Sequence, residues 1–215
     1  MLGLRLSLPQ DRPLRLLALG AHCDDIEIGA GGTVRRLIGE HAAVDARWVV
    51  VAASDGRSDE ALASAEHFLR GAASRDIDVM GYRESFLPDH WGEIKERFFD
   101  LARAFSPDLV LTHRRVDRHQ DHRVVADLTW NTFRDQVVLE YEIPKYEGDL
   151  GHPNLFVPLE EEVVADKVEA LVRFFPSQAA RGWFDAETFR SILRLRGIEC
   201  NARYAEAFHA HKLRL

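Results

Sequence analysis

Residues 14–33 read LRLLALGAHCDDIEIGAGGT, and this stretch decides the fold. Its first seven residues are apolar except for Arg15 and end at Gly20, which predicts a short buried strand. A glycine-rich segment follows, and a helical pattern continues from Val34. One histidine and two adjacent carboxylates therefore stand where a first strand ends and a first helix begins.

These polar residues, His22, Asp24 and Asp25, predict a metal site. Ligands of open α/β sheets bind at the carboxyl ends of the strands. Buried carboxylates without a partner are costly, and a divalent cation would compensate them. Imidazole and carboxylate groups suit tetrahedral zinc. Because adjacent side chains point in different directions, we expect one aspartate to bind the metal and its neighbour to reach the water on it.

A second strand, predicted at residues 109–112, precedes the segment DRHQDH at residues 117–122. We expect His22, Asp25 and His122 to hold one metal ion and to leave a position open for water. Zinc lowers the pKa of such a water to about 7, and a carboxylate within reach can then take its proton.

If His122 is a ligand, His119 is free to face a substrate and to stabilise a developing oxyanion. Asp121 is expected to hydrogen-bond an imidazole of the metal site from outside. Together these groups predict metal-assisted hydrolysis of a carbonyl compound, most simply an amide.

Strands and helices alternate along the rest of the chain. Further strands are predicted at residues 45–53, 76–80, 137–143 and 155–158, and helices at residues 58–71, 93–105, 123–133, 160–175 and 186–196. This alternation predicts an α/β protein with a mostly parallel sheet and helices on both faces. No linker or repeat divides the sequence, so residues 1–215 are expected to form a single domain.

Composition limits the function classes. The net charge of −7 and the lack of a long basic block argue against a nucleic-acid-binding protein. No apolar run approaches the ~20 residues of a membrane span, and residues 1–13 are too charged for a signal peptide. With only Cys23 and Cys200, a disulfide framework is not expected and a cytoplasmic protein is the default.

The segment AHCDDIEIGAGGT, residues 21–33, resembles the A-H-P-D-D-E-x-x-G-x-G-G-T signature of the LmbE/PIG-L-type N-acetylglucosaminyl deacetylases, with one residue inserted before the glutamate. Residues 117–122 are similar to the second signature of that family, H-x-D-H with a preceding aspartate. Ser54-Asp55-Gly56 matches its T-D-G, and weaker similarities continue to residues 204–208.

The resemblance implies a Rossmann-like fold and removal of acetyl groups from N-acetylated sugars or related conjugates. It implies that His22, Asp25 and His122 bind one zinc ion per chain. Asp24 would be the general base, and His119 the electrostatic stabiliser or the acid. The implied partner is a small molecule, and a homo-oligomer is compatible with the sequence.

Two departures from the family pattern concern the turn and the substrate. Cys23 replaces the usual proline, and Ala63 stands where an arginine often precedes the helix glutamate, here Glu66. Another group must then contact the substrate. Candidates, chosen for their charge or their position at strand ends, are Arg57, His113, Arg114 and Lys145.

Two other functions compete with deacetylation. A metal-dependent phosphoesterase would also use carboxylates and histidines, but two-metal sites need more bridging acids than the sequence offers. A non-catalytic, metal-stabilised protein would need neither Asp24 nor His119, since neither is required to hold the ion. Measured metal content and acetate release separate these alternatives.

Overall fold

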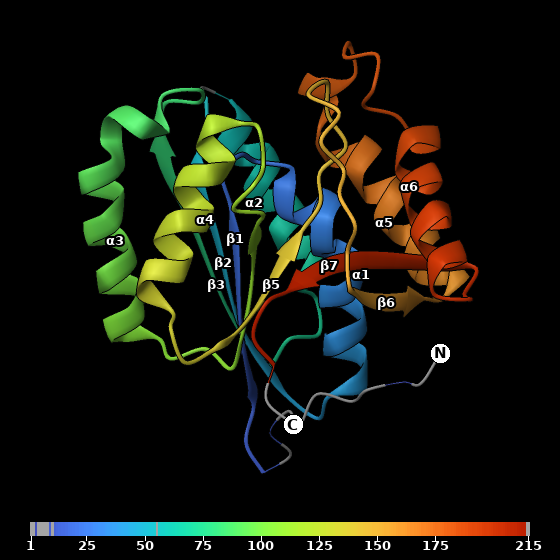
Figure 1. Cartoon of the computed structure of the whole chain (residues 1–215), viewed down its shortest axis with the longest axis horizontal. Helices are drawn as coiled ribbons and strands as arrows, with labels where there is room; N and C mark the ends of the chain where they lie inside the picture. The colour runs from blue at the N-terminus through green and yellow to red at the C-terminus, as the bar shows by residue number, and fades with distance from the viewer. Residues whose placement is uncertain (1–2, 4–8, 10, 55, 214–215) are drawn as a thin grey trace.

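The computed structural model describes residues 3, 9, 11–54 and 56–213, so Asp55 lies outside the described residues. The strands are β1 (Leu14–Gly20), β2 (Val44–Ala52), β3 (Ser74–Tyr82), β4 (Leu109–His113), β5 (Val137–Tyr141), β6 (Leu155–Leu159) and β7 (Tyr204–Ala210). Within the described ranges they form one seven-stranded sheet in the order β3-β2-β1-β4-β5-β7-β6 (Figure 1). The pairs from β3 to β5 are parallel, and β7 runs antiparallel to both of its neighbours.

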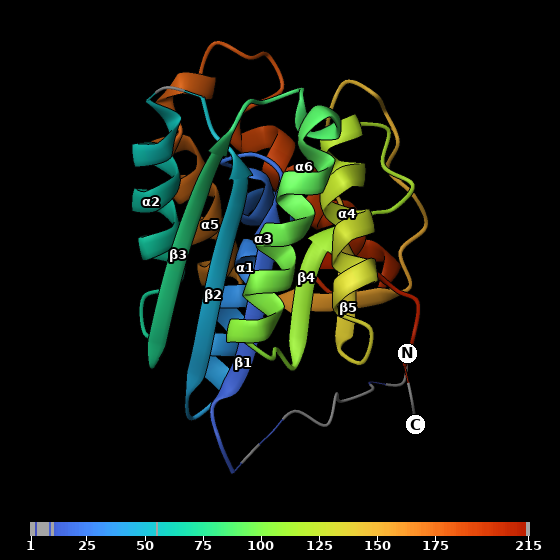
Figure 2. The ribbon, with the colours of Figure 1, turned by 90° about the vertical axis from the view of Figure 1, so that its left-hand side faces the viewer.

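Helices cover both faces of this sheet. They are α1 (Asp25–Glu40), α2 (Arg57–Phe68), α3 (Trp91–Ala104), α4 (Gln120–Thr132), α5 (Glu161–Phe174) and α6 (Ala186–Glu199). On one face lie α1, α2, α5 and α6, and on the other lie α3 and α4 (Figures 1 and 2). Neighbouring residues of β1 alternate between the two cores: Leu16 packs into the first and Leu17 into the second. The predicted fold class is confirmed.

The glycine-rich segment differs from its prediction, because it lies inside α1 and not before it. A Cβ at Gly29 would overlap the ring of Tyr141, and one at Gly31 would lie 2.6 Å from Phe68. The glycines therefore let α1 approach the sheet and α2 closely.

Two further elements also depart from prediction. Helix α4 begins at Gln120, three residues earlier than expected, because the side chain of His119 accepts a hydrogen bond from the amide of Asp121 and caps the helix. Strand β7 is not among the predicted strands. It is an antiparallel addition between β5 and β6, and Glu206 interrupts its apolar pattern.

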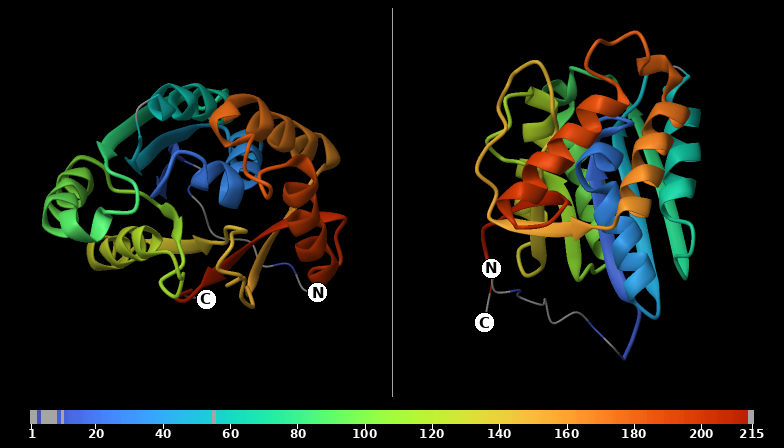
Figure 3. Two further views of the ribbon diagram at one scale, coloured as in Figure 1. Left: turned by 90° about the horizontal axis from the view of Figure 1, so that it is seen from above. Right: turned by 90° about the vertical axis from the view of Figure 1, so that its right-hand side faces the viewer.

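The order of the strands places the carboxyl ends of β1 and β4 side by side. The chain proceeds from β1 to β2 and β3 in one direction, and from β4 to β5 in the other. Ligands of such sheets bind at this switch point. The left-hand view of Figure 3 looks from above onto this edge of the sheet. None of the helices in the described ranges is long and apolar enough to cross a membrane.

Candidate metal centre

The polar side chains predicted to cooperate meet at the switch point. His22 and Asp24 lie in the turn after β1, and Asp25 is the first residue of α1. His113 ends β4, and His122 lies in the first turn of α4. Two segments about a hundred residues apart in sequence are thus brought together by the parallel pairing of β1 with β4.

The three predicted ligands lie at nearly equal separations. Nδ1 of His22 is 3.2 Å from Nε2 of His122 and 3.3 Å from Oδ2 of Asp25. Oδ1 of Asp25 is 3.5 Å from Nε2 of His122. Ligand atoms about 2.0–2.1 Å from a tetrahedral zinc ion lie roughly 3.3 Å from one another. The spacing and the chemistry of this donor set therefore fit zinc.

A carboxylate contacts each imidazole at the ring nitrogen that points away from the other imidazole. Nε2 of His22 lies 3.0 Å from Oδ2 of Asp121, and Nδ1 of His122 lies 3.1 Å from Oδ2 of Asp117. A neutral imidazole that donates to such a carboxylate carries its lone pair on the other nitrogen. The lone pairs of His22 and His122 then belong to the two nitrogens that face each other, as a shared metal ion requires.

Two other histidines border this group, and their nitrogens have different partners. Among the described residues, His22, His119 and His122 form one group with metal-binding spacing, and Asp25, His113 and His122 form another. However, Nε2 of His113 accepts the amide of Ala21 at 2.9 Å. Nδ1 of His119 accepts the amide of Asp121 at 3.2 Å. These lone pairs are already engaged, which favours His22 and His122 as the imidazole ligands.

Asp24 is buried beside a cation. Nη2 of Arg57 lies 3.3 Å from Oδ2 of Asp24, and Nη1 of Arg57 donates to Glu84 at 2.7 Å. Burial raises the pKa of the Asp24 carboxyl, and the charge of Arg57 opposes that effect. A carboxyl group in this place is suited to taking up and returning a proton.

The remaining predicted residues lie in different surroundings. His113 is fully buried and stacks against His122, with ring centroids 3.9 Å apart, so it lies behind the ligands and offers no surface to a substrate. Arg114 donates to the carbonyl of Asp149 at 2.6 Å. Lys145 lies 2.9 Å from Oδ2 of Asp117 and 2.6 Å from Oδ1 of Asp149. Arg114 and Lys145 therefore connect segment 142–154 to the loop after β4.

Two residues of the site did not figure in the sequence prediction as functional groups, Asp117 and Glu84. Asp117 precedes His122 by five residues, and its sequence signal was its place as the preceding aspartate of the second signature, to which no role was assigned. Glu84 follows β3, so its signal was a carboxylate near the carboxyl end of a strand. Asp121 does hydrogen-bond an imidazole, and that imidazole belongs to His22.

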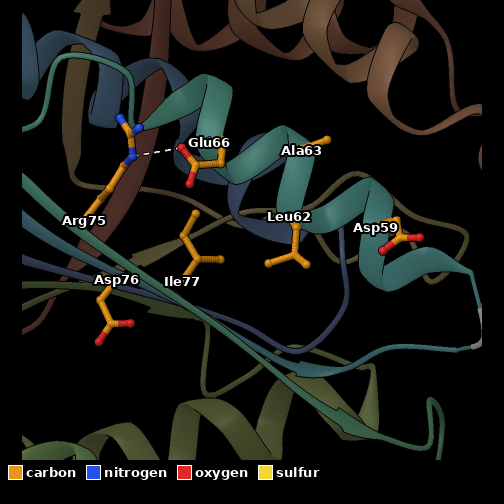
Figure 4. A pocket seen from close by; sticks show the side chains of 7 residues that line it. All are labelled: Asp59, Leu62, Ala63, Glu66, Arg75, Asp76 and Ile77. Atoms are coloured by element: carbon orange, nitrogen blue, oxygen red, sulfur yellow. Dashed lines mark ion pairs between the residues drawn. The ribbon is translucent and has the colours of Figure 1, made fainter.

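A surface groove lies elsewhere on the described part of the chain. It has a volume of about 570 Å³ and runs between α2 and β3 (Figure 4). An ion pair of 2.8 Å between Glu66 and Arg75 spans it, and Leu62 and Ile77 line it. None of its lining residues belongs to the candidate metal centre.

Comparisons with solved structures show the fold. The conserved protein TT1542 from Thermus thermophilus has a TM-score of 0.73 and 21% identity, over 94% of this chain and 96% of that one. N,N'-diacetylchitobiose deacetylase from Pyrococcus horikoshii has a TM-score of 0.70 and 20% identity, over 96% and 87%. The 4-carboxy-2-hydroxymuconate hydratase GalB from Pseudomonas putida has a TM-score of 0.73 and 17% identity, over 94% and 98%. A deacetylase and a hydratase thus share one fold, which alone does not select a reaction.

The family is shown by sequence. The family model for the PIG-L proteins, described as GlcNAc-PI de-N-acetylase, matches residues 17–133. That match covers both the segment after β1 and the segment after β4, and it confirms the predicted resemblance. Because it spans more than half of the 215 residues, the chain belongs to the PIG-L family.

Proposed function

We propose that the protein is a zinc-dependent hydrolase that removes the acetyl group from the nitrogen of an N-acetylated sugar or sugar conjugate. The observation that carries the proposal is the set of separations of 3.2–3.5 Å among His22, Asp25 and His122. Membership of the PIG-L family supports the reaction class.

His22, Asp25 and His122 would hold the ion, with Asp121 and Asp117 fixing the two imidazoles. A zinc ion held there would lower the pKa of water and polarise the acyl carbonyl.

Asp24 acts as the general base. It takes a proton from the attacking water, whose oxygen adds to the carbonyl carbon of the amide. When the carbon–nitrogen bond breaks, the same proton can pass to the departing nitrogen. The second proton of the water stays on the new carboxyl group and is lost to solvent when that group ionises, so the products are acetate and a free amine.

His119 acts as a hydrogen-bond donor to the acyl oxygen. Its Nδ1 accepts the amide of Asp121, so in the neutral ring the proton is on Nε2. A donor at this place stabilises the negative charge that develops on the oxygen. The roles of Asp24 and His119 therefore differ: one moves protons, and the other stabilises charge.

The test is a metal-loaded substrate screen that measures both acetate and freed primary amine. About one zinc per chain together with acetate release from an N-acetylated sugar supports the proposal. A hydratase would release no acetate, and a two-metal phosphoesterase would bind two ions and release phosphate. Protein that carries zinc and is folded, yet frees no acetate from any N-acetyl sugar of a broad panel, would contradict it.

A further inference from the structure

Asp117 contacts both of the site histidines that follow β4. Its Oδ1 accepts the amide of His119 at 2.8 Å, and its Oδ2 lies 3.1 Å from Nδ1 of His122. The aspartate is buried, with 3% of its surface exposed. A displacement of this one carboxylate would therefore move a proposed metal ligand and the proposed donor to the acyl oxygen together.

The group that holds Asp117 in place comes from a different part of the chain. Nζ of Lys145, 28 residues later in segment 142–154, lies 2.9 Å from Oδ2 of Asp117, the same oxygen that faces the imidazole. The Lys145 side chain is 10% exposed and also lies 2.6 Å from Oδ1 of Asp149. Oδ2 of Asp149 in turn accepts a backbone amide of the loop after β4 at 2.8 Å. The ammonium group thus lies between two carboxylates that are themselves held by hydrogen bonds.

A buried lysine at this place is costly in two ways. An ammonium group loses its hydration when it is buried, and a long side chain loses rotamer freedom. A cation this close to a metal centre also repels the metal ion. Connecting the two segments does not require that cost, because Arg114 already joins them by donating to the carbonyl of Asp149 at 2.6 Å. The contact that sets Lys145 apart from Arg114 is the one with Asp117.

We propose that Lys145 is a positioning residue of the metal centre: it holds Asp117 in the orientation that directs Nε2 of His122 to the metal ion. This inference rests on the proposed function for the identity of the metal and its ligands. It extends the metal centre to segment 142–154, from which none of the proposed ligands comes.

The experiment measures the zinc Kd by competition with a chromophoric chelator, so no substrate is needed. Lys145→Met removes the charge at nearly the same length and should raise the Kd about tenfold, the lower end of the range for groups that orient a metal ligand. Lys145→Gln is measured in parallel and should also raise the Kd, so the result does not depend on the folding of one variant. Lys145→Arg keeps the charge and several donors and should recover most of the affinity.

The matched control is Arg114→Met, which removes the other side-chain connection between the same two segments. It should lower the unfolding free energy of the metal-free protein and leave the zinc Kd unchanged. In the zinc-loaded protein, the ¹H resonance of the His122 ring proton reports the hydrogen bond to Asp117. That resonance should shift in Lys145→Met and keep its position in Arg114→Met.

Three results would overturn the positioning role. An equal rise of the Kd in Arg114→Met and Lys145→Met would show that Lys145 only connects the two segments. Tighter zinc binding by Lys145→Met would show that removal of the repelling charge outweighs any loss of orientation. A His122 resonance that does not move in Lys145→Met would show that Asp117 keeps its place without the lysine. Zinc bound as expected without acetate release from any N-acetyl sugar would instead overturn the proposed function, so the two failures are distinguishable.

Discussion

Helix α1 contacts two buried clusters of charge that differ in one respect. In the middle of α1, Glu206 accepts the amides of Gly32 and Thr33 at 2.7 and 2.6 Å, and Lys167 lies 2.6 Å from Glu206 and donates to the carbonyl of Ile28. Each charge there has its partners inside the protein. This saturated cluster is complete without a ligand.

At the N-terminus of α1 the arrangement is the opposite. Acceptor atoms of His22, Asp25 and His122 face one another. The other ring nitrogens of the two imidazoles donate their protons to the carboxylates of Asp121 and Asp117. Acceptors that face one another without a donor between them are unfavourable unless a cation joins them. Burial of charge alone therefore does not identify a functional site. What identifies it is that acceptor atoms face one another, where in the other cluster each acceptor faces a donor.

The largest expected effect is on turnover and comes from Asp24→Asn. The amide cannot take a proton from water, so kcat should fall by about 10²–10⁴-fold. Zinc content, measured by elemental analysis of the dialysed protein, should stay at the wild-type value because Asp24 is not a proposed ligand. Near-normal turnover with zinc bound would remove Asp24 from its role, and loss of zinc would place it among the ligands.

The saturated cluster predicts a large effect on stability alone. Lys167→Met leaves the carboxylate of Glu206 buried without its cation, and removal of one partner of such a pair costs about 3–5 kcal/mol of unfolding free energy. Urea unfolding of the metal-free protein measures this loss. Zinc affinity of the folded variant should not change. A variant as stable as the wild type would show that the two clusters are not as different as their hydrogen bonds indicate.

Removal of the metal should lower stability through the candidate metal centre and leave the Lys167–Glu206 cluster unchanged. Zinc that binds only the folded protein at a concentration about 100 times its Kd adds about 3 kcal/mol to the unfolding free energy. Chelation should therefore lower the urea midpoint, and restored zinc should recover it. The loss should add to that of Lys167→Met, because the two clusters share no partner. Equal stability with and without zinc would contradict a metal site among His22, Asp25 and His122.

The two clusters also differ in how much of each could be predicted from the sequence. The strand-to-helix junctions at residues 14–33 and 109–122 were predictable, because apolar runs end there in histidines and aspartates. Asp117 and Glu84 reach their partners through space, from loops whose course no periodicity encodes. Lys167 falls on the apolar side of a predicted helix, and its partner Glu206 lies 39 residues later on a strand that is absent from the prediction. Long-range complementarity of this kind leaves no local pattern.

The smallest predicted effect concerns Glu142, a second buried carboxylate whose hydrogen-bond partners all lie inside the protein. It tests how the stabilisation by such a carboxylate depends on pH. Arg196 donates to it at 2.9 and 3.0 Å, and the amide of Gly151 donates at 3.0 Å. Burial raises the pKa of Glu142, but His209, Arg196 and this amide outweigh burial and lower it below its usual value.

A carboxyl group whose pKa is lower in the folded protein stabilises the fold above its unfolded pKa, about 4.3 for glutamate, and loses that contribution as the pH falls through the folded value. Glu142→Gln should therefore cost about 2 kcal/mol at pH 7. The gap to the wild type should close as the pH falls below about 4, which unfolding curves at several pH values would show. A gap that stays constant with pH would mean that shape, not charge, holds segment 142–154 in place.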